Sequence, residues 1–346
     1  MSWVAESGRS AGRMAESGVF VKGVDVKRFL LITNIHKDKE RKLTGRLKNY
    51  IEMRGGSCTC FYSSGERVED AAPRADEIPS GVDCVMVLGG DGTLIRAASA
   101  LVNSRLPFVG VNLGTLGYLC ELEEGSVFAA IDQMMSGACM VEERMLLQGA
   151  GMCRQEDILS GEGQSPECGK DEDAAEKGCI PWSAGEICPE RKPVQRAALN
   201  DIVIYRTGPL SVVSLIVYVN GEYLHTFRAD GIILATPTGS TGYNMSAGGP
   251  IVDPKAEMIL ITPINAHNLS SRSIVVGAED EIVVEIGRRR FRRDESVEVS
   301  FDGDTVAKLA VGDRFFVRRA KETVRICRLS RKSFLEILSR KMQMYT

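Results

Sequence analysis

Val85-Met-Val-Leu-Gly-Gly-Asp-Gly-Thr-Leu94 decides the fold of the first half of the chain. A short apolar run ends in a glycine-rich turn, and a helical pattern of apolar residues continues to Val102. Short strands are expected on either side, over 29–33 and 107–111, with a helix over 43–51. Strand, glycine turn, helix and strand in this order predict an α/β domain with a Rossmann-like parallel sheet.

The glycine turn is typical of phosphate chemistry. Ligands collect at the carboxyl ends of parallel strands, where glycines expose backbone N–H groups and a helix N-terminus favours negative charge. We therefore expect Gly89, Gly90, Gly92 and Thr93 to bind donor phosphates. A bare Asp91 would repel phosphate, so it is expected to hold Mg²⁺ or to accept a proton from an attacking hydroxyl. The simpler alternative is a tight turn with Asp91 as helix N-cap.

From Ala198 onward the pattern becomes mostly β. Asn220-Gly221 separates two strand patterns and predicts a hairpin. The runs 281–286 and 297–301 are expected to form another pair, with the arginine-rich stretch 288–293 as its solvated tip. Ser333-Phe-Leu-Glu336 resembles a capping box and predicts a closing helix.

Two further polar segments are candidates for ligand contact. The loop from Asp230 to Pro250 is dense in glycine and hydroxyl residues, and long loops in compact domains are usually functional. Its Tyr243 is suited to stack on a base. Asn200-Asp201 precedes an apolar strand, and these two residues can offer an amide and a carboxylate to ribose hydroxyls. Each segment alone also fits an ordinary surface loop or turn.

Composition narrows the function classes. The chain has 346 residues, 44% apolar, with a formal net charge of −3, so no basic field points to nucleic acid or to an anionic membrane. No apolar run has the length of a membrane span. Ten cysteines without a C-x-x-C pair in a chain of this size favour a reducing, cytoplasmic location. Residues 1–25 are expected to form a disordered tail.

Residues 151–196 differ from the rest. They hold ten acidic and six basic residues and show no periodicity, which predicts a flexible acidic insertion. A zinc site is the alternative, but the spacing matches no usual ligand pattern. Its four ligands would be Cys153, Cys168, Cys179 and Cys188.

Taken together, the motifs resemble the NAD kinase family over about 26–147 and 197–346. The resemblance rests on Gly-Gly-Asp-Gly-Thr at 89–93, Asn200-Asp201, the block at 230–250, the block at 261–273 and Ser-Phe-Asp-Gly at 300–303. It implies an α/β domain over 26–147, a β-rich, sandwich-like NAD-binding domain over 197–319, and a final segment, 320–346, that folds back onto the first domain. Three positions depart from the family: Asp201 replaces glutamate, Gly242 replaces alanine, and Asp304 replaces glutamine or arginine.

The resemblance implies transfer of phosphate from ATP to the adenosine-ribose 2′-hydroxyl of NAD, with Mg²⁺ accompanying ATP and Asp91 as proton acceptor. It also implies a homodimer or homotetramer. The implied NAD contacts are Asp91, Gly92, Arg96, Asn200, Asp201, Arg228, Asp230, Thr241, Gly242, Tyr243, Asn244 and Ser246. Two alternatives stay open: a lipid kinase of the diacylglycerol or sphingosine type, which shares the glycine turn, and a dinucleotide sensor without catalysis.

Overall fold

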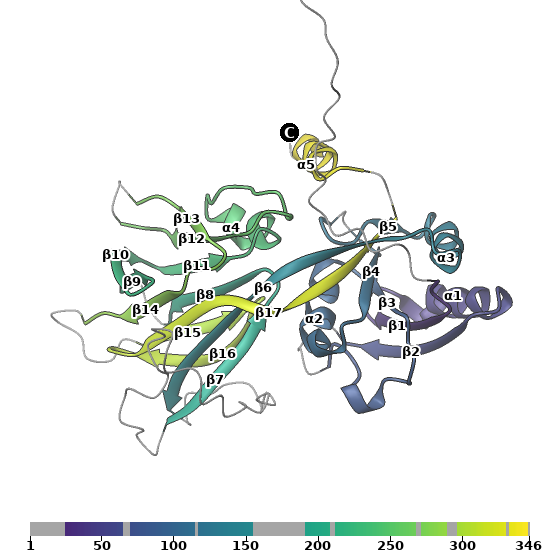
Figure 1. Ribbon diagram of the computed structural model, residues 1–346, viewed down its shortest axis with the longest axis horizontal. Helices are drawn as coiled ribbons and strands as arrows, with labels where there is room; N and C mark the ends of the chain where they lie inside the picture. Colours follow the sequence, from purple (N-terminus) through teal and green to yellow (C-terminus); the bar gives the residue numbers. More distant parts are fainter. Residues whose placement is uncertain are drawn as a thin grey trace, which may run out of the picture.

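The computed structural model shows two lobes joined by long strands (Figure 1). It describes residues 25–64, 70–114, 117–154, 191–207, 212–267, 271–288, 296–329 and 332–344. The predicted tail and most of the acidic segment lie outside these ranges. Among the helices of the described ranges, none is long and apolar enough to cross a membrane.

The N-terminal lobe is a three-layer α/β unit. Its parallel strands run in the order β2-β1-β3-β4, and the short β5 (Leu122–Glu123) pairs with β4. Apolar side chains of α1 and α3 cover one face of this sheet, and those of α2 cover the other. The remaining bounds are β1 Arg28–Asn34, α1 Lys42–Met53, β2 Ser57–Ser63, β3 Cys84–Gly89, α2 Asp91–Ala100, β4 Pro107–Asn112 and α3 Val127–Met135.

The C-terminal lobe is a β-sandwich. One wall is an antiparallel sheet in the order β13-β12-β11-β8-β15-β16, and the other contains β10, β9 and β14. Inward residues of both walls form one buried core. The bounds are β8 Asp201–Arg206, β9 Val213–Val219, β10 Glu222–Ala229, β11 Gly231–Ala235, α4 Tyr243–Ser246, β12 Met258–Ile264, β13 Ile274–Gly277, β14 Ile282–Ile286, β15 Ser296–Phe301 and β16 Asp304–Ala310.

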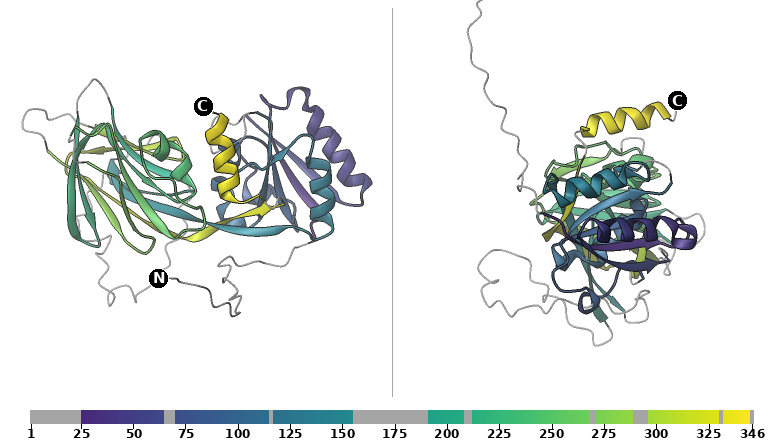
Figure 2. Two further views of the ribbon diagram at one scale, coloured as in Figure 1. Left: turned by 90° about the horizontal axis from the view of Figure 1, so that it is seen from above. Right: turned by 90° about the vertical axis from the view of Figure 1, so that its right-hand side faces the viewer.

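Two strands of 15 residues, β6 (Met140–Arg154) and β17 (Arg314–Arg328), cross from one lobe to the other. At about 3.3 Å per residue each spans roughly 50 Å. The start of β17 pairs with β14, and its end pairs in parallel with β4. One 11-stranded mixed sheet therefore runs through both lobes. The helix α5 (Phe334–Met344) follows β17 and stands on the side of the N-terminal lobe that faces the sandwich (Figure 2).

Several local expectations are confirmed. The predicted fold class is present, with an α/β lobe and a β-rich lobe. Asn220 and Gly221 have φ of 51° and 81° and form the tight turn between β9 and β10. Ser333 and Glu336 form the capping box: each backbone N–H donates to the side chain of the other residue.

Two expectations are wrong in part. The runs 281–286 and 297–301 do not pair, because β14 and β15 belong to opposite walls of the sandwich. The two runs therefore do not form the expected hairpin, and 289–295, which include most of the arginine-rich stretch, lie outside the described residues. The predicted flexible insertion is also wrong at its two ends, since 151–154 belong to β6 and 191–196 to β7 (Arg191–Ala198), which pair antiparallel; 155–190 lie outside the described residues.

Candidate functional site

The glycine turn at the end of β3 opens α2, and Asp91 is the first residue of that helix. Its carboxylate makes no helix-capping hydrogen bond, so the N-cap alternative is wrong. Instead, backbone N–H groups of the 117–120 loop donate to it: Oδ2 accepts from Tyr118 at 2.6 Å and Leu119 at 3.3 Å, and Oδ1 accepts from Cys120 at 3.0 Å. A Cβ on Gly117 would overlap Oδ1, so only glycine permits this approach.

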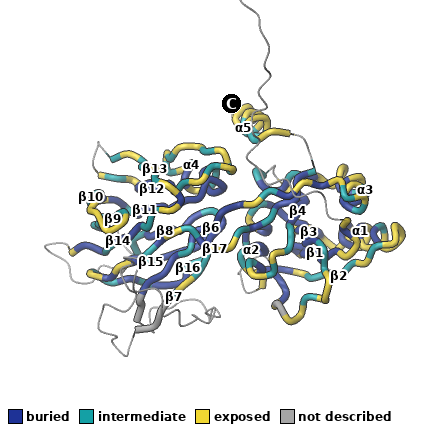
Figure 3. The backbone as a smooth tube through the Cα atoms, viewed as in Figure 1, coloured by how far each residue is buried: buried dark blue, intermediate teal, exposed yellow. Residues whose placement is uncertain are grey.

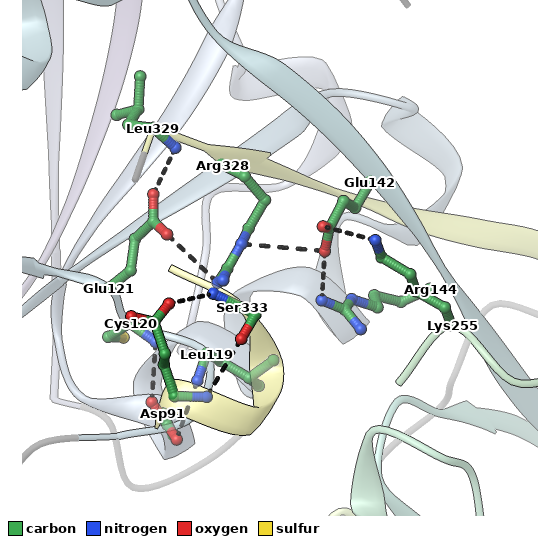
Figure 4. Close-up of polar contacts among 11 residues, drawn as sticks. Asp91, Leu119, Cys120, Glu121, Glu142, Arg144, Lys255, Arg328, Leu329 and Ser333 are labelled. Atoms are coloured by element: carbon green, nitrogen blue, oxygen red, sulfur yellow. Dashed lines mark hydrogen bonds and ion pairs between the residues drawn. The ribbon is translucent and has the colours of Figure 1, made fainter. Parts of the chain in front are cut away.

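A chain of charged side chains continues from this loop toward the second lobe (Figure 4). Glu121 accepts the Leu329 N–H and lies 3.3 Å from Arg328. Arg328 in turn lies 3.9 Å from Glu142, which also holds Arg144 at 2.6 Å and, from the sandwich side, Lys255 at 3.9 Å. Burial lowers the pKa of Arg144. The loop that holds Asp91 is thus connected by ion pairs to both crossing strands and to the β-sandwich.

Asn200 and Asp201 lie where β7 passes into β8, and Asp302 anchors them. The Asp302 carboxylate accepts backbone N–H groups of Leu199, Asn200 and Asp201 at 2.8, 2.7 and 3.2 Å. It also accepts the hydroxyl of Ser99, at 3.1 Å, from α2. One side chain therefore ties the helix of the glycine turn to the Asn200–Asp201 turn.

A cavity of about 680 Å³ opens on the sandwich lobe beside this turn. Its size suits a small-molecule ligand. Four residues expected from the sequence line it: Asn200, Asp201, Asp230 and Tyr243. Its other lining residues are Val203, Tyr205, Arg206, Ile264, Asn265, Ser300, Asp302, Gly303 and Thr305.

Some polar groups of the cavity have hydrogen-bond partners in the described part of the protein, and one buried group does not. Asp230 accepts hydrogen bonds from Asn265 at 3.0 Å and Arg206 at 2.8 Å, and these bonds lower its pKa. By contrast, Asn200 Oδ1 is buried without a hydrogen-bond partner among the described residues. A buried acceptor without a partner is uncommon and indicates a missing donor.

Asp201 is buried, and burial raises its pKa to about 7, with the nearby Asp302 charge as a second cause. Because this is above the ordinary value of 3.8, the folded chain binds more protons than the unfolded chain between about pH 4 and 7. The stability that protonated Asp201 contributes is complete below about pH 4 and is lost as pH rises through 7.

We predict that Asp201→Asn weakens this pH dependence. The free energy of unfolding is measured by urea denaturation at pH 5 and at pH 8. Its decrease from pH 5 to pH 8 should be larger for the parent chain than for the variant, since asparagine carries no ionisable carboxyl. Equal falls in both proteins, or a rise in the parent alone, would show that Asp201 titrates in its ordinary range.

The remaining predicted NAD contacts fall into two groups, whereas Gly89, Gly90 and Thr93 of the glycine turn are buried. Exposed or half-buried positions are Gly92, Arg96, Arg228, Thr241, Gly242 and Ser246. Asn244 is instead fully buried; its amide donates to Ser240 and Pro250 carbonyls and accepts the Thr262 hydroxyl. Asn244 therefore braces the 236–250 loop from within and presents no surface to a ligand.

Arg96 extends along α2 toward Gly92 and the sandwich. Its guanidinium lies 3.5 Å from the position a Cβ on Gly92 would take, and its Nε is buried without a partner among the described residues. Burial lowers its pKa, and the charge of Asp304 opposes that shift. Asp304 also pairs with Arg196 at 2.7 Å. Asp304, which replaces the glutamine or arginine of the family pattern, thus lies near two arginines, Arg96 and Arg196.

The residues that hold these groups in place were not predicted from the sequence. Asp302 stood inside the quoted Ser300–Gly303 motif, but its partners at 199–201 are about a hundred positions away. Tyr205, Arg206 and Asn265 gave no local signal. Lys37 was also missed: its Nζ lies 2.7 Å from the position of a Cβ on Gly90.

A phosphate-type glycine turn on an α/β lobe, whose helix is joined through Asp302 to a polar cavity of a β-sandwich lobe, is typical of a two-domain kinase. Comparisons with known proteins make this specific. The model of the ATP-NAD kinase N-terminal domain matches 24–139, and that of the C-terminal domain matches 199–329. The chain belongs to the NAD kinase family.

Relatives match over nearly the whole chain. It is 48% identical to an NAD kinase of Agathobacter rectalis, over 93% of this chain and 100% of the relative. It is 34% identical to an NAD kinase of Lachnospira eligens, over 92% and 100%. A yeast NADH kinase complexed with NADH shares the fold at 21% identity, with a TM-score of 0.72 over 93% of this chain and 89% of that one.

Proposed function

We propose that this chain transfers the terminal phosphoryl group of ATP to the 2′-hydroxyl of the adenosine ribose of NAD, giving ADP and NADP. The observation that carries the proposal is the position of Asp302. Its four hydrogen bonds join α2, which begins at Asp91, to the Asn200–Asp201 turn at the wall of the cavity. A phosphate-binding turn and a hydroxyl-binding turn are thereby held in fixed relation, as phosphoryl transfer requires.

The acceptor ribose is assigned to Asn200 and Asp201. Asn200 Oδ1 is the buried acceptor without a partner, and a ribose hydroxyl supplies the donor it lacks. Asp201 lies beside it on the cavity wall. Tyr243 is 47% exposed at the same cavity, so its ring is free to pack on the adenine. Asp230, Thr241 and Ser246 are proposed to complete the dinucleotide site, without Asn244.

Asp91 is proposed as the proton acceptor. Three backbone N–H groups and the weakly donating Cys120 thiol hold the carboxylate in place. The carboxylate takes the 2′-hydroxyl proton as the new O–P bond forms and the bond from phosphorus to ADP breaks. Gly89, Gly90, Gly92 and Thr93 are proposed to hold the donor phosphates at the start of α2.

We propose that magnesium enters this site as an ion carried by ATP. No group of three or more His, Cys, Asp and Glu side chains in the described ranges is arranged to hold a metal, and the Asp91 carboxylate faces backbone N–H groups. Mg²⁺ bound to the triphosphate neutralises charge on the phosphates. We also propose a cytoplasmic enzyme that works as a homodimer or homotetramer.

The proposed acceptor is tested against the lipid-kinase alternative by a substrate comparison. The purified chain is incubated with ATP and Mg²⁺ together with NAD, diacylglycerol or sphingosine, and ADP release is measured. We expect ADP release when NAD is the acceptor and none with either lipid. Release with a lipid but not with NAD would assign the cavity to a different acceptor, and tight NAD binding without ADP release would identify a sensor.

We predict that Asn200→Ala raises the Michaelis constant for NAD much more than that for ATP. Loss of a polar partner in a buried site costs about 1–3 kcal/mol, or roughly 5- to 150-fold. The measurement is steady-state kinetics with each substrate varied in turn. Asn265→Ala, in the same cavity and bonded to Asp230, is the matched comparison. A change in the ATP constant alone would place Asn200 in the donor half of the site.

A further inference from the structure

Lys37 follows β1, next to the glycine turn. Because β1 and β3 are parallel neighbours, the segments that follow them emerge at the same edge of the sheet. The Asn34 amide donates to Thr93 at 3.4 Å and so joins the two segments. The Lys37 ammonium lies 2.7 Å from the position of a Cβ on Gly90 and 3.6 Å from that on Gly114. The ammonium group therefore lies directly over the glycine turn.

The backbone on both sides of Lys37 is fixed. The Lys37 N–H donates to the Asn34 carbonyl at 3.1 Å, and the next residue, Asp38, is buried. Its carboxylate accepts the Leu43 N–H at 3.1 Å and the Thr44 N–H at 2.9 Å, which anchors the segment to the start of α1. The position of Lys37 over the turn is thus set by the fold, while its own side chain stays exposed.

The positive charge of Lys37 is not neutralised by the protein. No ion pair joins Lys37 to a carboxylate anywhere in the described part of the chain. The acid of the turn itself, Asp91, is directed into the 117–120 loop. The second lysine near the turn, Lys341 of α5, already packs on the Tyr118 ring, 3.7 Å from its centroid. Within the described part of the chain, the Lys37 charge therefore remains available to an incoming anion at Gly90.

We propose that Lys37 is a ligand of the β- and γ-phosphates of ATP, and this inference rests on the proposed function. An ammonium on a flexible stem is a point charge that several phosphate oxygens can share. At the start of α2 it adds to the backbone N–H groups of the turn and to the helix dipole. It supplies the lysine that this turn lacks in its own sequence, which has no Gly-Lys-Ser/Thr.

The test compares Lys37→Met with Lys39→Met, an exposed lysine two residues away with no atom within 4 Å of the Cβ positions on Gly90 and Gly114. Lys37→Met should raise the Michaelis constant for ATP about 10- to 100-fold, since hydrogen bonds to charged groups are the strong ones. The constant for NAD should stay within about twofold, and Lys37→Arg should recover part of the ATP affinity. Lys39→Met should match the parent. Direct titration of ATP·Mg²⁺ by calorimetry should show the same ranking.

An unchanged ATP constant in Lys37→Met, with an active parent chain, would overturn the inference and leave the proposed function intact. A rise in the NAD constant alone would overturn it as well, because it would place Lys37 on the acceptor. Failure of the parent chain to form NADP would instead overturn the proposed function; calorimetric ATP binding would then still decide the role of Lys37. Equal melting temperatures of the variants and the parent exclude a folding effect.

Discussion

Asp91→Asn is expected to lower kcat for NADP formation by about 10²- to 10⁴-fold, the usual contribution of a general base. The variant keeps the size of the side chain but loses the proton-accepting carboxylate. NAD affinity, measured by calorimetry, should change little, because the ribose contacts are assigned to Asn200 and Asp201. Near-normal turnover at saturating substrate would remove Asp91 from the role of base.

The geometry demands a control for this variant, because the carboxylate also holds the 117–120 loop. An asparagine would turn an NH₂ group toward at least one N–H donor and so loosen the loop. Gly117→Ala is unsuitable, because a Cβ at position 117 would overlap the carboxylate itself. The control is instead hydrogen exchange of the Tyr118, Leu119 and Cys120 amides, which reports how far Asp91→Asn loosens the loop. We expect the loss of turnover with little faster exchange, and much faster exchange would mean that Asp91 acts by positioning the loop.

Asp302→Ala is expected to be the most destabilising of the proposed changes. Backbone N–H groups of Leu199, Asn200 and Asp201 would lose their acceptor, at about 1–3 kcal/mol for each group left unpaired in a buried place. Chemical denaturation should show this loss of stability. In the fraction that folds, the Michaelis constant for NAD should rise, because the Asn200–Asp201 turn is no longer held.

Ser99→Ala is the matched control for Asp302. It removes the bond from α2 to Asp302 but leaves the three backbone bonds in place. We expect kcat to fall in this variant with little change in the constant for NAD, because the two turns lose a tie while the ribose site stays formed. If Asp302→Ala is as stable as the parent, the anchoring role assigned to Asp302 is wrong.

The glycine turn could be predicted from the sequence because its signals are local. An apolar strand, adjacent glycines and a helical period stand within 18 residues, over 85–102. The hairpin at Asn220-Gly221 and the capping box at Ser333 are local in the same sense. The turn at Asn200-Asp201 was predicted from a family motif. The structure explains its shape, because the Asp302 carboxylate accepts three backbone N–H groups over 199–201.

The features that could not be predicted depend on contacts between distant residues. The run that became β15 alternates apolar and polar residues, the run that became β14 is mostly apolar, and strands that follow each other in a chain often pair. In the sandwich they occupy opposite walls and still bury Val284, Val297 and Val299 in one core, so these patterns fit either pairing. The same holds for Asp302 and Lys37, since neither carries a local pattern that indicates its partner.

The most direct measurement of the central claim is the position of the phosphate in the product. The chain is incubated with NAD, ATP and Mg²⁺, and the product is isolated and examined by mass spectrometry and by phosphorus and proton nuclear magnetic resonance. We expect a single added phosphate, coupled to the 2′-proton of the adenosine ribose, formed in equal amount with ADP. A phosphate at the 3′-hydroxyl or on the nicotinamide ribose, or ADP formed without phosphorylated NAD, would contradict the account.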